Sequence, residues 1–121
     1  MGQVDHPFAA EGPESALVSI TDQLVPILKS INLETVLGTP FGDIPGGQFI
    51  TIPITDVIVH TWDIAKSTGQ DTTMDAGLAE FGYNVMTQVV PSGRENGAFE
   101  PEVVVPATAS FQGRLLGLSG R

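Results

Sequence analysis

The fold of this chain is decided by the stretch Ile54-Thr55-Asp56-Val57-Ile58-Val59-His60-Thr61-Trp62-Asp63. Its β-branched residues and the alternation just before it favour a strand. The surrounding segment 48–68, however, is far longer than a usual strand of roughly five or six residues. It ends in a basic turn, Ala65-Lys66-Ser67-Thr68, followed by Gly69, which is typical of a helix C-terminus. The stretch therefore predicts a helix that begins near Pro53.

Three polar residues share one face of this predicted helix. Asp56 and His60 are one turn apart, and Asp63 follows at the seventh position after Asp56. Asp56 and His60 would also share a face in a strand, because a spacing of four is even. Carboxylate oxygens and imidazole nitrogens are donors that zinc and nickel accept, so Asp56 and His60 are candidate metal ligands.

The same spacing has less specific interpretations. Polar pairs four residues apart are common on helix surfaces, and a buried histidine can simply be satisfied by a neighbouring carboxylate. Asp63 is expected to accept the other N–H of a ligating His60, or to be a solvated acid. A third metal ligand would have to come from a second chain, from Asp63, or from the other histidine, His6.

The rest of the sequence predicts a mainly α fold of three to four helices with a short strand or hairpin. A helix is expected over 14–31, kinked or split at Pro26, followed by a loop over 32–47 with a short strand at 35–37. A third helix is expected over 78–90, ending at Pro91. Gly77 and Gly82 weaken it and are expected to allow close approach of another helix. A short strand at 102–105 and a final helix over 111–118, capped by Thr108 or Ser110, complete the prediction.

These elements predict a flexible tail over 1–13 and a single helical domain over 14–121. A complete antiparallel bundle needs four comparable helices, and here the last helix is short. We therefore expect a second copy of the chain to complete the bundle as a homodimer.

The charge balance excludes several classes of partner. Fourteen acidic residues against five basic ones give a net charge of −9, which repels nucleic acid and anionic membranes. The N-terminus lacks a signal peptide pattern, and no apolar run approaches the ~20 residues of a membrane span. These features predict a cytoplasmic protein. Arg94 and Arg114, two of the five bases, are candidates for binding a carboxylate group of a small substrate, or for surface salt bridges.

Three stretches of the sequence resemble those of a known family, the actinobacterial DinB-like proteins related to mycothiol-dependent maleylpyruvate isomerase. The segment Asp56–Gln70 is similar to that family's signature of an acid, three apolar residues and a His-x-Trp-Asp run. The loop Thr39–Gly46 resembles the segment before that helix. The third stretch is the C-terminal end, which resembles the family in three short pieces: Gly97–Val103, Val105–Ala107 and Gln112–Leu116.

This resemblance implies a metal-binding four-helix bundle whose early helices this sequence lacks. The family's ligands are a histidine on an early helix and, on a later helix, an acid and a histidine four residues apart. Asp56 and His60 match the later pair, with aspartate in place of the usual glutamate. The resemblance further implies a divalent metal, mycothiol as cosubstrate, and isomerase or transferase activity on a small molecule. The alternative is a non-catalytic helical dimerisation or interaction module that has lost the full metal site.

Overall fold

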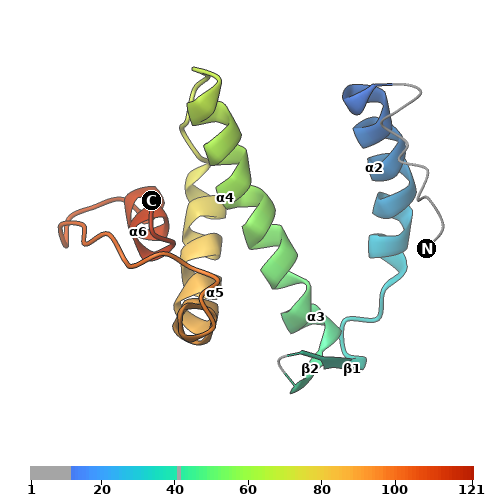
Figure 1. The fold of residues 1–121 in the computed structure, drawn as a ribbon. Coiled ribbons are helices and arrows are strands. Elements are labelled where there is room, and N and C mark those ends of the chain that lie inside the picture. The colour runs from blue at the N-terminus through green and yellow to red at the C-terminus, as the bar shows by residue number, and fades with distance from the viewer. Residues whose placement is uncertain (1–11, 41) are drawn as a thin grey trace.

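The computed structural model describes residues 12–40 and 42–121, and this part of the chain is mainly helical, as predicted. The predicted tail, with His6, lies outside the described residues except at its last two positions, and Pro13 already belongs to the first described helix. The elements in chain order are α2 (Pro13–Ser30), β1 (Val36–Thr39), β2 (Gly42–Pro45), α3 (Gly46–Phe49), α4 (Thr51–Ser67), α5 (Ala76–Glu95) and α6 (Phe111–Leu118) (Figure 1).

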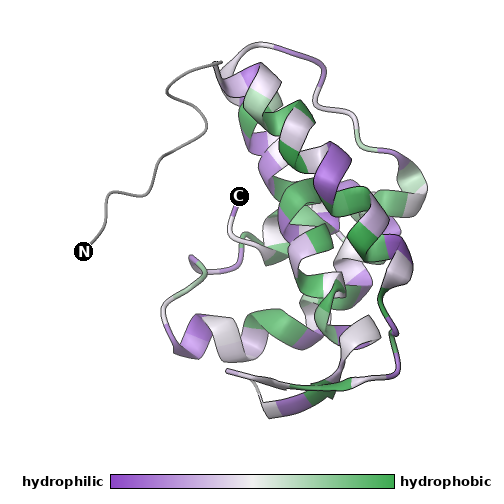
Figure 2. Cartoon of the chain, turned by 90° about the vertical axis from the view of Figure 1, so that its right-hand side faces the viewer, coloured by the Kyte–Doolittle hydropathy of each residue, from purple (hydrophilic) through white to green (hydrophobic). Residues whose placement is uncertain are grey.

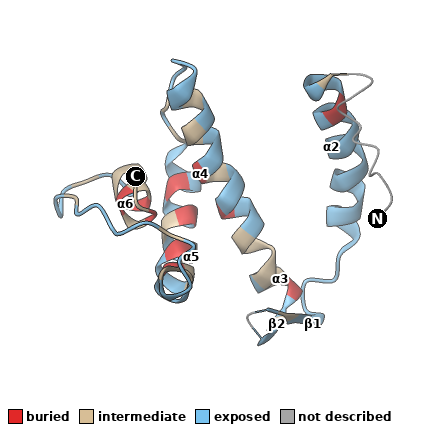
Figure 3. Cartoon of the chain, viewed as in Figure 1, coloured by how far each residue is buried: buried red, intermediate tan, exposed pale blue. Residues whose placement is uncertain are grey.

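The core lies where α4, α5 and α6 pack together. Val59 of α4, Met86 and Val90 of α5, and Leu115 of α6 form its buried cluster. Figure 3 shows this buried cluster along α4, α5 and α6. Gly82 permits the close approach that the sequence predicted, since a Cβ there would lie 3.0 Å from a methyl carbon of Leu115. The core therefore joins three helices, with α5 between the other two.

The helix α2 lies apart from this core (Figure 1). It makes no extensive contact with any other described element, and nearly all of it is exposed (Figure 3). It reaches α4 through the two-stranded antiparallel hairpin β1–β2 and the short helix α3. The Gly46 N–H donates to the Thr35 carbonyl at 2.8 Å, and the Gly47 N–H donates to the Leu33 carbonyl at 2.7 Å. These bonds fasten the segment after α2 to the start of α3.

Two helices continue through a proline. The end predicted at Pro91 for the helix over 78–90 is wrong, because α5 continues to Glu95. The helix α2 is continuous through Pro26 and is therefore not split there, and the alternative, a kink at Pro26, stays a prediction. A proline removes one N–H and leaves the carbonyl four residues earlier without its helical partner. Both prolines are exposed, so water can satisfy that carbonyl and the helix continues.

Other predicted boundaries were closer. The helix α4 begins at Thr51, slightly before the expected start at Pro53, and Ser110 caps α6 by accepting from the Gly113 N–H at 3.2 Å. The predicted strand at 102–105 is wrong, because that segment has no regular secondary structure. Its Val103 N–H donates to the Gly117 carbonyl at 2.9 Å, which ties the segment to α6. The short helix α3 was not predicted.

Candidate functional site on α4

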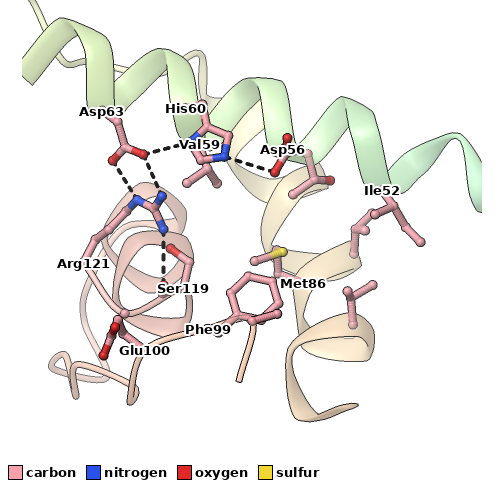
Figure 4. Close-up of a pocket in the computed structure, with 15 residues that line it drawn as sticks. Ile52, Asp56, Val59, His60, Asp63, Met86, Phe99, Glu100, Ser119 and Arg121 are labelled. Atoms are coloured by element: carbon pink, nitrogen blue, oxygen red, sulfur yellow. Dashed lines mark hydrogen bonds and ion pairs between the residues drawn. The ribbon is translucent and has the colours of Figure 1, made fainter. Parts of the chain in front are cut away.

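Asp56, His60 and Asp63 form a contiguous polar row on one face of α4, as predicted. The imidazole of His60 lies between the two carboxylates (Figure 4). Its Nε2 atom is 3.2 Å from Asp56 Oδ1, and its Nδ1 atom is 3.0 Å from Asp63 Oδ2. The Asp56 and His60 side chains are 68% and 57% exposed, whereas that of Asp63 is 35% exposed. The row therefore runs from an open end at Asp56 to a sheltered end at Asp63.

Arg121 holds the sheltered end of this row. Its Nε donates to Asp63 Oδ1 at 2.7 Å and its Nη2 donates to Asp63 Oδ2 at 2.6 Å, a bidentate pair (Figure 4). A third donor, Nη1, binds the Ser119 carbonyl at 3.2 Å. These hydrogen bonds from Arg121, aided by the one from His60, lower the pKa of Asp63 to about 2, although partial burial opposes the shift. Asp63 is therefore a fixed carboxylate at neutral pH.

The fixed charge on Asp63 determines where the proton on His60 sits. An ionised carboxylate can only accept hydrogen bonds, so the Nδ1 atom of His60 must carry the proton in their 3.0 Å contact. In a neutral imidazole Nε2 then carries the lone pair and faces Asp56 Oδ1 at 3.2 Å, a separation at which a cation could lie between them. In a protonated imidazole Nε2 instead donates to that carboxylate. The row therefore places one nitrogen and one carboxylate oxygen together at its exposed end.

The row borders a cleft of about 530 Å³ between α4, α5 and the end of the chain. The side chains of Val59, Met86 and Phe99 form an apolar wall, and Asp56, His60 and Asp63 form a polar one (Figure 4). Among the described residues that line the cleft, Arg121 is the one that carries a fixed positive charge. A cleft of this size and mixed lining is typical of small-molecule sites.

Arg94 and Arg114 do not line this cleft. Arg94 donates to the carbonyls of Glu100 and Leu118 at 3.1 and 2.7 Å. Arg114 donates to the carbonyls of Ala107 and Ala109 at 2.6 and 3.0 Å, and its guanidinium carbon lies 5.7 Å from the ring centroid of Phe111. Both arginines therefore brace the loop 96–110 around α6, and their role in substrate binding stays a prediction.

The donors near His60 form a pair rather than a full ligand set. Across residues 12–40 and 42–121, no group of three or more His, Asp or Glu side chains is arranged to hold a metal ion. The two carboxylates of the row approach different nitrogens of His60, on opposite edges of the ring. Asp63 is thus placed as the partner that orients His60, and metal ligation by Asp56 and His60 stays a prediction.

Arg121 is the site residue that the sequence analysis did not single out. It is 58 positions from Asp63 in the chain, so helical spacing gives no hint of their contact. A signal did exist in the composition. A chain with only five basic residues and a row of acids on a partly apolar helix needs a cation near that row, and Arg121 was one of few available.

Comparison with known proteins finds two relatives, both in Mycobacterium tuberculosis. They are Uncharacterized protein Rv0738 of strain ATCC 25618 / H37Rv and Uncharacterized protein MT0763 of strain CDC 1551 / Oshkosh. Each is 50% identical over 40 residues, which is 33% of this chain and 22% of the relative. No protein-family model matches the chain, and no solved structure matches it significantly. The chain thus resembles uncharacterised actinobacterial proteins over part of its length.

Within residues 12–40 and 42–121, no helix combines the length and the apolar character that a bilayer crossing requires. The expected cytoplasmic location stays a prediction.

Proposed function

We propose that this chain binds a divalent metal ion, zinc or nickel, through Asp56 and His60 at the open end of the α4 row. One observation carries the proposal: Asp63, fixed by Arg121, accepts from His60 Nδ1 and leaves Nε2 beside Asp56 Oδ1 at 3.2 Å. Metal-binding histidines usually donate their second N–H to a carboxylate in this way. The resemblance to the DinB-like and maleylpyruvate isomerase-like proteins supports the same two residues.

The donor set fits a metal only in part. Catalytic zinc sites normally use three protein ligands and water, and the described residues offer a pair. The remaining positions would be filled by a group from a second chain, by a residue outside those described, or by the substrate. When bound, the metal would supply Lewis acidity to a small carbonyl substrate or activate a thiol cosubstrate such as mycothiol.

The chain's own residues would then have separate tasks in an isomerase or transferase. Asp63 and Arg121 keep the His60 ring in one orientation, which preserves the direction of Nε2. Val59, Met86 and Phe99 exclude water from the inner wall of the cleft and hold the apolar part of a small substrate. Asp56 remains exposed, so a ligand can reach it from solvent.

Metal analysis of untagged protein tests this proposal. We expect zinc or nickel to bind the wild type, measured by equilibrium dialysis and elemental analysis, and to bind His60→Ala and Asp56→Asn at least about tenfold more weakly. Asp71→Asn is the matched control, because Asp71 is an exposed aspartate outside the cleft. Equal metal content in the wild type and His60→Ala would remove His60 as a ligand.

A second candidate function is a non-catalytic helical interaction module. The exposed apolar side chains of α2 and the incomplete donor set favour it. It predicts that neither zinc nor nickel binds above background, and that the Asp56–His60 contact exists without an ion. A fully coordinated metal at His60 would contradict it.

A further inference from the structure

Most apolar side chains of α2 are exposed in the described part of the chain, Ala16 being the buried exception. Leu17, Ile20, Leu24 and Ile27 are 64%, 43%, 46% and 57% exposed. Monomeric proteins rarely expose a contiguous apolar patch beyond a few hundred Å². Figure 2 shows hydrophobic and hydrophilic residues alternating along the helices, as expected of helices with one apolar face. An exposed apolar face of this extent indicates an interaction surface.

These four residues form what we call the α2 stripe. They are separated by three, four and three positions, which is the spacing of core positions in paired helices. Leu28 lies beside the stripe, whereas Ser15, Ser19, Asp22 and Lys29 fall on the opposite face. Pro26 also falls on that polar face. A proline there bends a helix toward its other side, so the stripe would lie on the inner, concave side.

We propose that the α2 stripe pairs with the α2 stripe of a second copy of this chain, in antiparallel orientation. The inference goes beyond metal binding, because a metal-binding chain and a non-catalytic module would pair in the same way. The stripe is self-complementary about Asp22: Leu17 falls opposite Ile27 of the second copy, and Ile20 falls opposite its Leu24. The Leu17–Ile27 pair and the Ile20–Leu24 pair each occur twice, related by the two-fold axis of the dimer.

The helix dipole and the exposed apolar surface of α2 both favour a second copy of the chain as the partner. Antiparallel pairing places the positive N-terminal end of each α2 dipole beside the negative C-terminal end of the other, which favours it over parallel pairing. The four stripe residues are 43% to 64% exposed, so they supply an apolar centre for such an interface, whose standard size is ~800 Å² per partner. With only Lys29 as a base, α2 is poorly suited to an anionic membrane.

The attachment of α2 keeps the stripe available for a partner. The hydrogen bonds of Leu33 and Thr35 to Gly47 and Gly46 hold the segment after α2 against α3. A Cβ on Gly47 would lie 3.1 Å from the Leu33 Cβ, so this junction is tightly packed. The junction and the hairpin separate α2 from α4, and the α4 residues Val57 and Ile64 stay exposed as well.

A charge placed in the stripe tests the pairing. We expect the full chain to dimerise at micromolar concentration in analytical ultracentrifugation, and Leu24→Glu to raise the dimer dissociation constant at least about 100-fold. Val18→Glu is the matched control, because Val18 is a similarly exposed aliphatic residue of α2 outside the stripe. It should change the constant by less than about threefold. Circular dichroism of both variants checks that α2 remains helical.

Several outcomes would overturn the inference. A wild type that stays monomeric up to ~100 μM would do so, because the proposed pairing predicts a dimer at micromolar concentration. If that monomer is also destabilised by Leu24→Glu, the stripe is covered within its own chain. If it binds uncharged lipid vesicles instead, the occupant is a membrane. Equal effects of Leu24→Glu and Val18→Glu would show a dimer that does not use the stripe.

Disulfide trapping tests the orientation. The chain contains no cysteine, so single-cysteine variants report on one contact each. Antiparallel pairing predicts that a mixture of Leu17→Cys and Ile27→Cys chains, oxidised gently, gives mainly the mixed disulfide dimer. Each variant alone should cross-link poorly, because its cysteines lie at opposite ends of the paired helices. Efficient cross-linking of each variant with itself, and none in the mixture, would mean parallel pairing and overturn the proposed arrangement.

Discussion

Helices α2 and α5 are similar in length, 18 and 20 residues, and both are amphipathic and contain an internal proline. Their surroundings differ. In α5 the apolar face buries Ala79, Met86 and Val90, whereas in α2 only Ala16 is buried. The same periodicity therefore produces a core helix in one place and an exposed stripe in the other. Amphipathicity specifies a face, but it does not specify what will cover that face.

Chain connectivity accounts for the difference. α5 follows α4 after the short turn 68–75 and precedes α6, so neighbouring elements fold back onto both sides of its apolar face. Glycine at position 82 lets Leu115 of α6 approach the backbone of α5. Between α2 and α4, in contrast, the chain inserts a hairpin and α3, and within the described residues the two strands pair with each other and pack beside α3. The polar row on α4 belongs to the packed region, where Arg121 holds its Asp63 end.

The largest expected effect on the free energy of unfolding comes from truncating one leucine in each region, Leu115 in the core and Leu24 in α2. Leu115 is fully buried, so Leu115→Ala should lower the free energy of unfolding by about 3 kcal/mol through lost burial and the cavity left behind. This loss should not depend on protein concentration. Leu24→Ala should cost less, and its cost should grow with protein concentration as the dimer becomes populated. Urea denaturation at two protein concentrations measures both. Losses of equal size, independent of concentration, would contradict the distinction between the regions.

A second pair of substitutions tests how tightly α6 is packed into the core. A Cβ on Gly117 would lie within van der Waals overlap of the Val103 carbonyl oxygen, a backbone atom that cannot move alone. We expect Gly117→Ala to lower the free energy of unfolding by about 2 kcal/mol. Gly113→Ala is the control on the same helix. Its Cβ would make ordinary contacts at 3.4 Å or more, so its effect should be near zero or stabilising by up to about 1 kcal/mol.

Thermal denaturation followed by circular dichroism compares these two glycine variants directly. If Gly117→Ala were as stable as Gly113→Ala, the segment 102–105 would not be held against α6. In that case the hydrogen bond from Val103 to Gly117 would contribute little to the fold.

The sequence predicted the parts of this fold that depend on local patterns. Spacing alone placed Asp56 and His60 on one face of a helix, and the observed α4 has that arrangement. Hydrophobic periodicity also located α2, α5 and α6. The helix end expected at Pro91 failed because a proline costs a helix least where its freed carbonyl faces water, and exposure is a property of the tertiary structure.

The parts that depend on contacts between distant residues could not be read from spacing. Arg121 meets Asp63 only because α6 packs across α5 and brings the end of the chain to α4. Arg94 and Arg114, chosen for their charge, instead donate to backbone carbonyls that only the folded loop 96–110 presents. Likewise, the amphipathic pattern of α2 predicted a helix but not that its apolar face would remain exposed.

The smallest expected effect concerns the bond between the row and the packed region. In the folded chain the pKa of Asp63 is about 2, below its ordinary value of 3.8, so the ionised form stabilises the fold. This contribution is complete above about pH 4 and is lost as the pH falls toward 2. Because the Asp63 side chain is 35% exposed, we expect Asp63→Asn to cost only about 1 kcal/mol at neutral pH.

Urea denaturation from pH 2 to pH 7 measures this contribution, and the wild-type and Asp63→Asn curves should converge at the acid end. Asp56→Asn is the control, since Asp56 contacts His60 at 3.2 Å but has no hydrogen bond to Arg121. A double-mutant cycle with Arg121→Gln then isolates the pair and should give a coupling free energy of about 1 kcal/mol. If Asp56→Asn reproduced the pH dependence of Asp63→Asn, the stabilisation would come from His60 and not from Arg121. The Asp63–Arg121 pair would then contribute little, and the Asp63 end of the row would be held no more firmly than the Asp56 end.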